Sequence, residues 1–147
     1  MTTTMNVVFT GGGTAGHVSP MLAMAEALVD RYVDTDVDVD ILMIGTAEGM
    51  EAALIPDAGY NFSTVDKVPM PRRASVDLLS VPFRLRKAVK QARQLLREHE
   101  TQVVVGVGGY ASTPVYLAAR AEKIPVIVHE GNVRPGLANK LAARFAS

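Results

Sequence analysis

Short apolar runs alternate with longer stretches of helical periodicity along the chain. The apolar runs predict strands at Asn6–Thr10, Val39–Ile44, Asn61–Val65, Val103–Val107 and Pro125–His129. The periodic stretches predict helices at Pro20–Arg31, Ala47–Ala58, Val76–His99, Thr113–Ala121 and Gly136–Ala146. This alternation indicates an α/β fold, a Rossmann-like parallel sheet with helices on both faces.

Three details refine this prediction. Gly59 is a natural end for the second helix, and Pro82 predicts an interruption in the third. The fourth and fifth strands, at 103–107 and 125–129, are almost wholly apolar. Such composition is typical of strands buried on both faces of a parallel sheet.

A glycine-rich loop, Gly11–His17, joins the first strand to the first helix. Glycines let the backbone approach a ligand, and a helix N-terminus favours an anion, so the loop predicts a phosphate-type site. Its spacing fits the dinucleotide motif G-x-G-x-x-G, but the far end of the second strand, Met43–Thr46, has no carboxylate for a ribose. A Walker A motif is excluded because no Lys-Ser/Thr follows. A tight turn without a ligand remains the alternative.

Two more polar or glycine-rich segments follow later strands. They are Gly106–Pro114, which runs into a helix, and His129–Asn132, which is followed by Pro135-Gly136. Each could be only a turn or a helix cap. Because the carboxyl ends of parallel strands lie at one edge of the sheet, we expect all three loops to meet there and form a binding crevice.

Composition narrows the class of protein. The chain has 147 residues, 48% of them hydrophobic, which suffices for one domain with a core. Its net charge of zero argues against nucleic acid as a general partner. The absence of cysteine excludes disulfides and thiolate metal sites. The polar N-terminus does not resemble a signal peptide, and no apolar run reaches the roughly 20 residues of a membrane span, so we expect a cytoplasmic location.

Together the three loops closely resemble a known family. Gly12–His17, Gly108–Tyr110 with Ser112, and His129–Asn132 followed by Gly136–Lys140 are similar to motifs of the MurG family of glycosyltransferases (glycosyltransferase family 28). The resemblance begins near Met5 and continues to the end of the chain. Members transfer N-acetylglucosamine from UDP-GlcNAc to lipid I, undecaprenyl-diphospho-MurNAc-pentapeptide, and so make lipid II for peptidoglycan.

The resemblance implies the GT-B architecture, in which two Rossmann-like domains face a cleft. Residues 1–147 would be the N-terminal, acceptor-side domain, and the C-terminal donor-binding domain would lie outside this chain. We therefore expect no complete catalysis from the chain alone. The family needs no metal or other cofactor, and none is expected here.

The resemblance also assigns residues to roles. It places donor contacts at Thr14, Ala15, Gly16 and Asn132, and acceptor-side or catalytic positions at His17, Tyr110 and Glu130. We expect the acceptor's diphosphate to be held by the glycine loops and their helix starts, at Gly12, Gly13, Gly108, Gly109, Tyr110 and Ser112. The sequence departs from the family pattern twice, with Ala15 in place of a glycine and Gly131 in place of a glutamine.

The implied reaction is an inverting displacement at the anomeric carbon, with UDP as the leaving group. It needs a base for the acceptor hydroxyl, and a histidine side chain exchanges protons near neutral pH. Our hypothesis is that His17 is this base or positions the hydroxyl. Glu130 is the rival, or it orients a histidine, and it could also be an ordinary solvated carboxylate.

Charge is unevenly distributed along the chain. Residues 26–66 hold ten acids and one base, whereas residues 67–97 hold nine bases and one acid. The basic part is interleaved with apolar residues, which is typical of a surface that rests on anionic lipid. This would place the protein peripherally on the cytoplasmic face of the membrane, through Arg72, Arg73, Val76, Leu79, Phe83, Arg84, Arg86 and Lys87. The alternative is an amphipathic helix packed on the sheet, which fits 88–96 better than 76–83.

Other functions remain open at this stage. A related GT-B enzyme could use a sterol, a diacylglycerol or another aglycone as acceptor. The chain could also be the acceptor and membrane-anchoring half of a split glycosyltransferase, not catalytic alone. A dinucleotide oxidoreductase is the least favoured alternative, for want of the acidic residue after the second strand.

Overall fold

The computed structural model describes residues 2–68 and 76–147, apart from the side chain of residue 77. Within them, parallel strands form one sheet in the order β3-β2-β1-β4-β5. The strands are β1 (Thr3–Gly11), β2 (Val37–Gly45), β3 (Asn61–Thr64), β4 (Val103–Gly108) and β5 (Val126–Val128). The helices are α1 (Ala15–Tyr32), α2 (Glu51–Asp57), α3 (Val81–Glu98), α4 (Ser112–Ala121) and α5 (Leu137–Ala142), with a short 3₁₀ helix at Val76–Ser80. The predicted α/β fold is confirmed.

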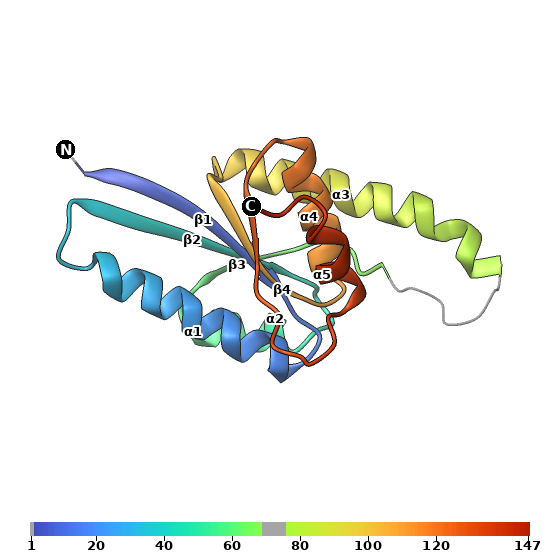
Figure 1. The fold of residues 1–147 in the computed structure, drawn as a ribbon, viewed down its shortest axis with the longest axis horizontal. Coiled ribbons are helices and arrows are strands. Elements are labelled where there is room, and N and C mark those ends of the chain that lie inside the picture. The colour runs from blue at the N-terminus through green and yellow to red at the C-terminus, as the bar shows by residue number, and fades with distance from the viewer. Residues whose placement is uncertain (1, 69–75) are drawn as a thin grey trace.

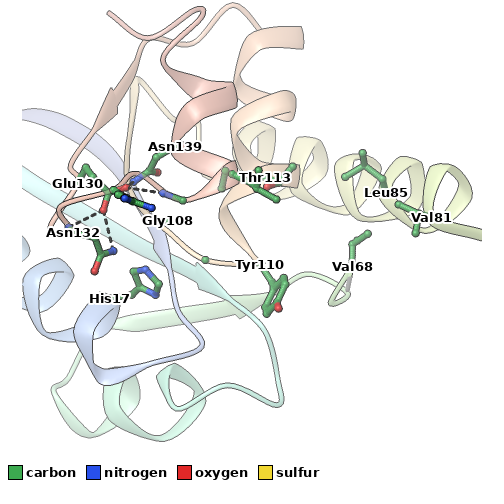
Figure 2. Close-up of a pocket in the computed structure, with 15 residues that line it drawn as sticks. His17, Val68, Val81, Leu85, Gly108, Tyr110, Thr113, Glu130, Asn132 and Asn139 are labelled. Atoms are coloured by element: carbon green, nitrogen blue, oxygen red, sulfur yellow. Dashed lines mark hydrogen bonds between the residues drawn. The ribbon is translucent and has the colours of Figure 1, made fainter. Parts of the chain in front are cut away.

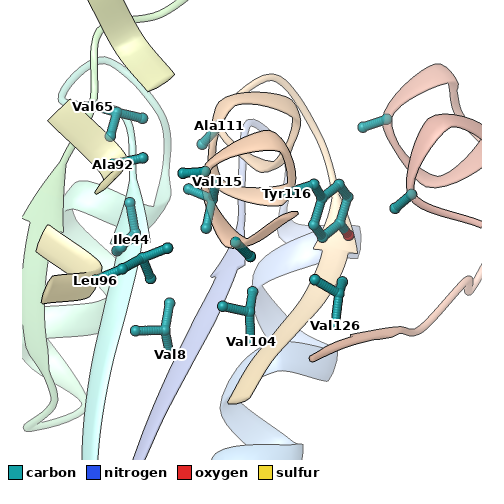
Figure 3. Packing of buried hydrophobic residues seen from close by; sticks show 14 residues of the cluster. Val8, Ile44, Val65, Ala92, Leu96, Val104, Ala111, Val115, Tyr116 and Val126 are labelled. Carbon is teal, nitrogen blue, oxygen red and sulfur yellow. The ribbon is translucent and has the colours of Figure 1, made fainter. Parts of the chain in front are cut away.

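The sheet is covered on both faces. Figure 1 shows α1 and α2 on one face and α3, α4 and α5 on the other. Neighbouring residues of β1 divide between these layers, because successive side chains of a strand point to opposite faces. Val8 joins the cluster under α3 and α4, whereas Val7 and Phe9 pack under α1. Figure 3 shows the first of these clusters, in which Tyr116 and Leu96 cover the valines of the sheet.

The first helix begins earlier than predicted. It starts at Ala15 rather than at Pro20, so His17 lies in its first turn. Pro20 cannot donate to the Gly16 carbonyl, but one missing bond near the N-terminus does not end an 18-residue helix whose face buries Val18 and Met21. The packing of that face outweighs the proline signal.

The prediction that the fifth strand is buried on both faces is wrong. β5 is the edge strand of the described sheet and pairs only with β4. Val126 is buried under α4 and α5, but Ile127 on the opposite face is 49% exposed. Because α1 lies over the centre of the sheet, it does not cover this position.

The third predicted helix is interrupted as expected. The 3₁₀ helix Val76–Ser80 precedes α3, and Pro82 occupies the first turn of α3, where a proline is tolerated. The second helix begins four residues later than predicted, at Glu51, and the last ends four residues earlier, at Ala142. None of the described helices is both long and apolar enough to cross a membrane.

Candidate functional site

The loops after β1, β4 and β5 meet at the carboxyl edge of the sheet, as predicted. The β1 and β4 loops are in direct contact, because a Cβ atom at Gly109 would collide with the carbonyl oxygen of Gly12. Gly109 also has a φ of +100°, which favours glycine. The close packing of these two loops therefore depends on glycine at position 109.

A pocket of about 470 Å³ lies at this edge. Figure 2 shows His17, Asn132 and Glu130 on one side of it and Tyr110, Val68, Val81 and Leu85 on the other. One end is thus polar, and the other is an apolar wall formed by α3 and the segment after β3. The lining also includes Gly108, Gly109, Thr113, Arg134, Gly136, Leu137, Ala138 and Asn139.

His17 is held by the loop that precedes it. Its Nδ1 lies 3.0 Å from the carbonyl oxygen of Gly12 and 3.2 Å from Oγ1 of Thr14. A carbonyl oxygen can only accept, so the bond to Gly12 places a proton on Nδ1. In the neutral ring, Nε2 then carries the free lone pair.

The carboxylate of Glu130 organises the loop after β5. Its Oε1 accepts from the backbone N–H of Asn132 at 2.8 Å and from the side-chain amide of the same residue at 3.0 Å. Its Oε2 accepts from the backbone N–H of Gly136 at 3.2 Å and from Nδ2 of Asn139 at 2.9 Å. The bond from the Asn132 backbone is the main cause that lowers the pKa of Glu130 from its ordinary 4.5 to about 2, against the effect of burial.

Asn139, which the sequence analysis gave no role, links this loop to the core. Its Nδ2 also donates to the carbonyl oxygen of His129 at 3.2 Å, and its Oδ1 accepts from the hydroxyl of Tyr116 at 2.8 Å. Tyr116 is fully buried, and burial raises its pKa to about 12, so the hydroxyl keeps its proton and remains a donor.

Glu51 is a second residue without a role in the sequence analysis. Its side chain is fully buried beside the β1 loop. One carboxylate oxygen accepts from the backbone N–H of Gly13 at 2.9 Å, and the other accepts from the N–H and the hydroxyl of Thr46 at 2.9 and 3.0 Å. Burial alone raises the pKa of Glu51, but these bonds outweigh it and the pKa is lowered.

Two groups expected at a diphosphate site are engaged within the domain. The N–H of Gly13 donates to Glu51. The hydroxyl of Ser112 is fully buried and donates to the carbonyl oxygen of Gly108 at 2.9 Å, while its N–H donates to Gly109. Ser112 thus shapes the β4 loop from beneath instead of facing the pocket.

The other residues expected in the site are near one another. His17, Gly108, Gly109, Tyr110, Glu130 and Asn132 all line the pocket. Thr14, Ala15 and Gly16 are exposed at the start of α1, next to His17. Gly12 is buried behind them.

The expected membrane surface is apolar and exposed where the structure describes it. Val76 and Leu79 in the 3₁₀ helix are 83% and 74% exposed, and Phe83 in the first turn of α3 is 76% exposed, at the end of α3 that lines the pocket. Arg84, Arg86 and Lys87 are exposed beside them, and Lys87 pairs with Asp66 at 2.8 Å. Arg72 and Arg73 lie outside the described residues.

Comparison with known proteins agrees with this geometry. The model of the glycosyltransferase family 28 N-terminal domain matches residues 7–147. The chain is 52% identical over 143 residues to the UDP-N-acetylglucosamine–N-acetylmuramyl-(pentapeptide) pyrophosphoryl-undecaprenol N-acetylglucosamine transferase of Paenarthrobacter aurescens. This match covers 97% of the chain and 37% of that protein. The chain is 51% identical over 142 residues to the protein of the same name from Cutibacterium acnes, again covering 97% of the chain and 37% of the relative.

A solved structure extends the agreement to three dimensions. The crystal structure of Acinetobacter baumannii MurG superposes with a TM-score of 0.82 at 32% identity, over 97% of this chain and 40% of that one. The fold is thus that of the N-terminal half of a GT-B glycosyltransferase. The chain spans less than half the length of these relatives. It belongs to glycosyltransferase family 28.

Proposed function

We propose that the chain is the acceptor-side domain of an inverting glycosyltransferase, which moves N-acetylglucosamine from UDP-GlcNAc to lipid I and makes lipid II. The relatives named above carry this activity in their names. The observation that carries the proposal is the pocket itself. It joins a histidine with a free ring nitrogen to an apolar wall at the start of α3, the same end of the helix that carries the exposed Phe83. This combination fits an acceptor that has both a sugar hydroxyl and a lipid tail.

In the proposed reaction His17 is the catalytic base. The acceptor hydroxyl attacks the anomeric carbon, the bond from that carbon to the UDP oxygen breaks, and the hydroxyl proton passes to Nε2 of His17. The other ring proton stays on Nδ1 throughout and remains hydrogen-bonded to the Gly12 carbonyl oxygen, so the ring keeps its orientation.

Glu130 is the weaker candidate for the base. Both of its oxygens accept hydrogen bonds, and a carboxylate whose pKa is about 2 has little affinity for a proton at neutral pH. Its proposed role is to hold Asn132 at the pocket edge, where this residue contacts the donor together with Thr14, Ala15 and Gly16.

The acceptor's diphosphate is proposed to bind at the β4 loop and the start of α4. Gly108, Gly109 and Tyr110 line the pocket there, and the N-terminus of α4 favours an anion. Arg134 lines the same pocket and adds a cation suited to phosphate. The engaged groups of Gly13 and Ser112 would support this site from behind.

The lipid tail is proposed to leave the pocket along the apolar wall toward the membrane. Val68, Val81 and Leu85 form this wall at the start of α3. Leu79 and Phe83 are exposed at the same end, with Phe83 on the opposite face of the helix from Val81 and Leu85. The cations at Arg84, Arg86 and Lys87 would contact anionic headgroups on the cytoplasmic face. The domain would then be bound peripherally, with the pocket at the level of the headgroups.

Transfer of labelled sugar from UDP-GlcNAc to a lipid I analogue, by the full-length protein that contains this domain, tests the proposal. We expect turnover with the wild type and a fall of about 100-fold or more with His17→Ala, the usual contribution of a general base. The melting temperature of the variant checks that it is folded. No transfer by the wild type would overturn the function, and near-normal turnover by the variant would remove His17 from the mechanism.

A further inference from the structure

One peptide group of the β1 loop is hydrogen-bonded on both sides. The N–H of Gly13 donates to Oε2 of Glu51 at 2.9 Å, and the carbonyl oxygen of Gly12 accepts from Nδ1 of His17 at 3.0 Å. This N–H and this carbonyl belong to the same planar peptide unit, which is trans. They point in opposite directions, so Glu51 and His17 lie on opposite sides of one peptide.

Glu51 has a fixed place in this arrangement. It lies at the start of α2 and reaches back under the ends of β1 and β2. Glycine at three positions makes the space, since a Cβ atom at Gly12, Gly45 or Gly49 would collide with its side chain. The carboxylate is fully buried, and hydrogen bonds from Gly13 and Thr46 engage both of its oxygens.

We infer that Glu51 is a positioning residue for His17 and acts through the Gly12–Gly13 peptide, an inference that rests on the proposed role of His17 as the base. A negative charge at the N–H end of a peptide polarises it and makes its carbonyl oxygen a stronger acceptor. A stronger acceptor at Gly12 keeps the proton on Nδ1 and leaves the lone pair on Nε2. In the catalytic triad of serine proteases a carboxylate does this by direct contact with the histidine. Here a peptide group stands between the two.

A role confined to folding would have different consequences. Glu51 also ties the end of β1 to the end of β2 through Thr46, so its loss must affect stability in either case. Only the proposed relay, from Glu51 through the Gly12–Gly13 peptide to His17, requires the tautomer of His17 to depend on Glu51. Only the relay requires a loss of turnover in protein that remains folded and binds both substrates normally.

The first test needs no measurement of activity. We expect ¹⁵N NMR of the full-length protein, labelled at histidine, to show the neutral ring of His17 protonated at Nδ1. In Glu51→Gln the side-chain amide cannot accept from both Gly13 and Thr46, and we expect the population protonated at Nε2 to rise. A wild-type ring protonated at Nε2 would overturn the relay, even if the variant failed to fold.

The second test is kinetic. We expect Glu51→Gln to lower kcat by about 10- to 100-fold, as the loss of an outer hydrogen-bond partner does at metal sites, with the KM values of both substrates unchanged. Glu48→Gln is the matched control, because it removes the same charge three residues away at an exposed position. Normal kcat in folded Glu51→Gln, or an equal loss in Glu48→Gln, would overturn the inference. Normal turnover in His17→Ala would instead overturn the proposed base, and the tautomer measurement would still decide the relay.

Discussion

The hydroxyl of Tyr116 in α4 donates to Oδ1 of Asn139 in α5 at 2.8 Å, inside the core and directly behind the pocket. Through Asn139 this bond extends to the carboxylate of Glu130. The shape of the β5 loop is therefore fixed by a buried tyrosine that does not line the pocket itself.

Asn139→Ala should lower the free energy of unfolding by about 3 kcal/mol, because it leaves the buried Tyr116 hydroxyl without its acceptor and removes a donor from Glu130. Tyr116→Phe removes one hydroxyl and should cost about 1–2 kcal/mol. Urea unfolding of both variants measures the difference. Equal stability of Asn139→Ala and the wild type would show that the connection is not energetically important.

Acid should weaken the β5 loop over a defined range. The pKa of Glu130 is about 2 in the folded protein, below its ordinary 4.5, so its ionised form stabilises the fold. That contribution is complete above pH 4.5 and is lost as the pH falls toward 2. A ¹³C titration of the Glu130 carboxyl should show a midpoint near 2, with the amide shifts of Asn132 and Gly136 following it. A midpoint near 4.5 would contradict the observed hydrogen bonds.

Gly109→Ala should destabilise the domain by about 2–3 kcal/mol and reduce activity, since the methyl group collides with Gly12 at a φ of +100°. Gly131→Ala is the matched control, because a Cβ there meets only Nε2 of His129 at 3.8 Å. We expect Gly131→Ala to be tolerated, and the same holds for the glutamine that the family pattern has at position 131. Thermal unfolding and transfer assays on both variants check this. A milder effect at Gly109 than at Gly131 would contradict the packing of the two loops.

Phe83→Glu should abolish co-sedimentation with vesicles that contain phosphatidylglycerol, without changing the melting temperature, because Phe83 is exposed and adjoins the cations of α3. Val33→Glu is the control. It changes a similarly exposed apolar residue, 71% accessible, at the far end of α1. Binding of the wild type should fall at high salt and on neutral vesicles. Undiminished binding of Phe83→Glu would remove this surface from the membrane contact.

The sequence predicted the parts of this molecule that depend on local pattern. The strands, their alternation with helices and the three loops at one edge follow from hydrophobic runs and glycines. The start of α1 was missed because Pro20 is a strong local signal, and the burial of Val18 and Met21 outweighs it. The exposure of Ile127 does not follow from the sequence, because the apolar run at 125–129 does not reveal which strand is at the edge of the sheet.

The supporting residues of the site could not be predicted in the same way. Glu51 has the pattern of an ordinary acidic residue in the first turn of a helix, and only the folded chain brings it to Gly13. Asn139 and Tyr116 are 23 residues apart and meet only where α4 and α5 pack. Long-range hydrogen bonds of this kind leave no periodic signal.

The strand order places β1 at the centre of the sheet, with one half of the chain wound to one side of it and the other half to the other. A protein engineer could therefore exchange part of the β5–α5 loop, provided that Glu130 keeps its hydrogen bonds to Asn132, Gly136 and Asn139, while leaving the β1–α1 loop and its histidine intact. The β4–α4 loop is less replaceable, because its Gly109 rests against Gly12. Part of the β5–α5 loop is thus open to redesign, whereas the β1–α1 and β4–α4 loops must be kept together.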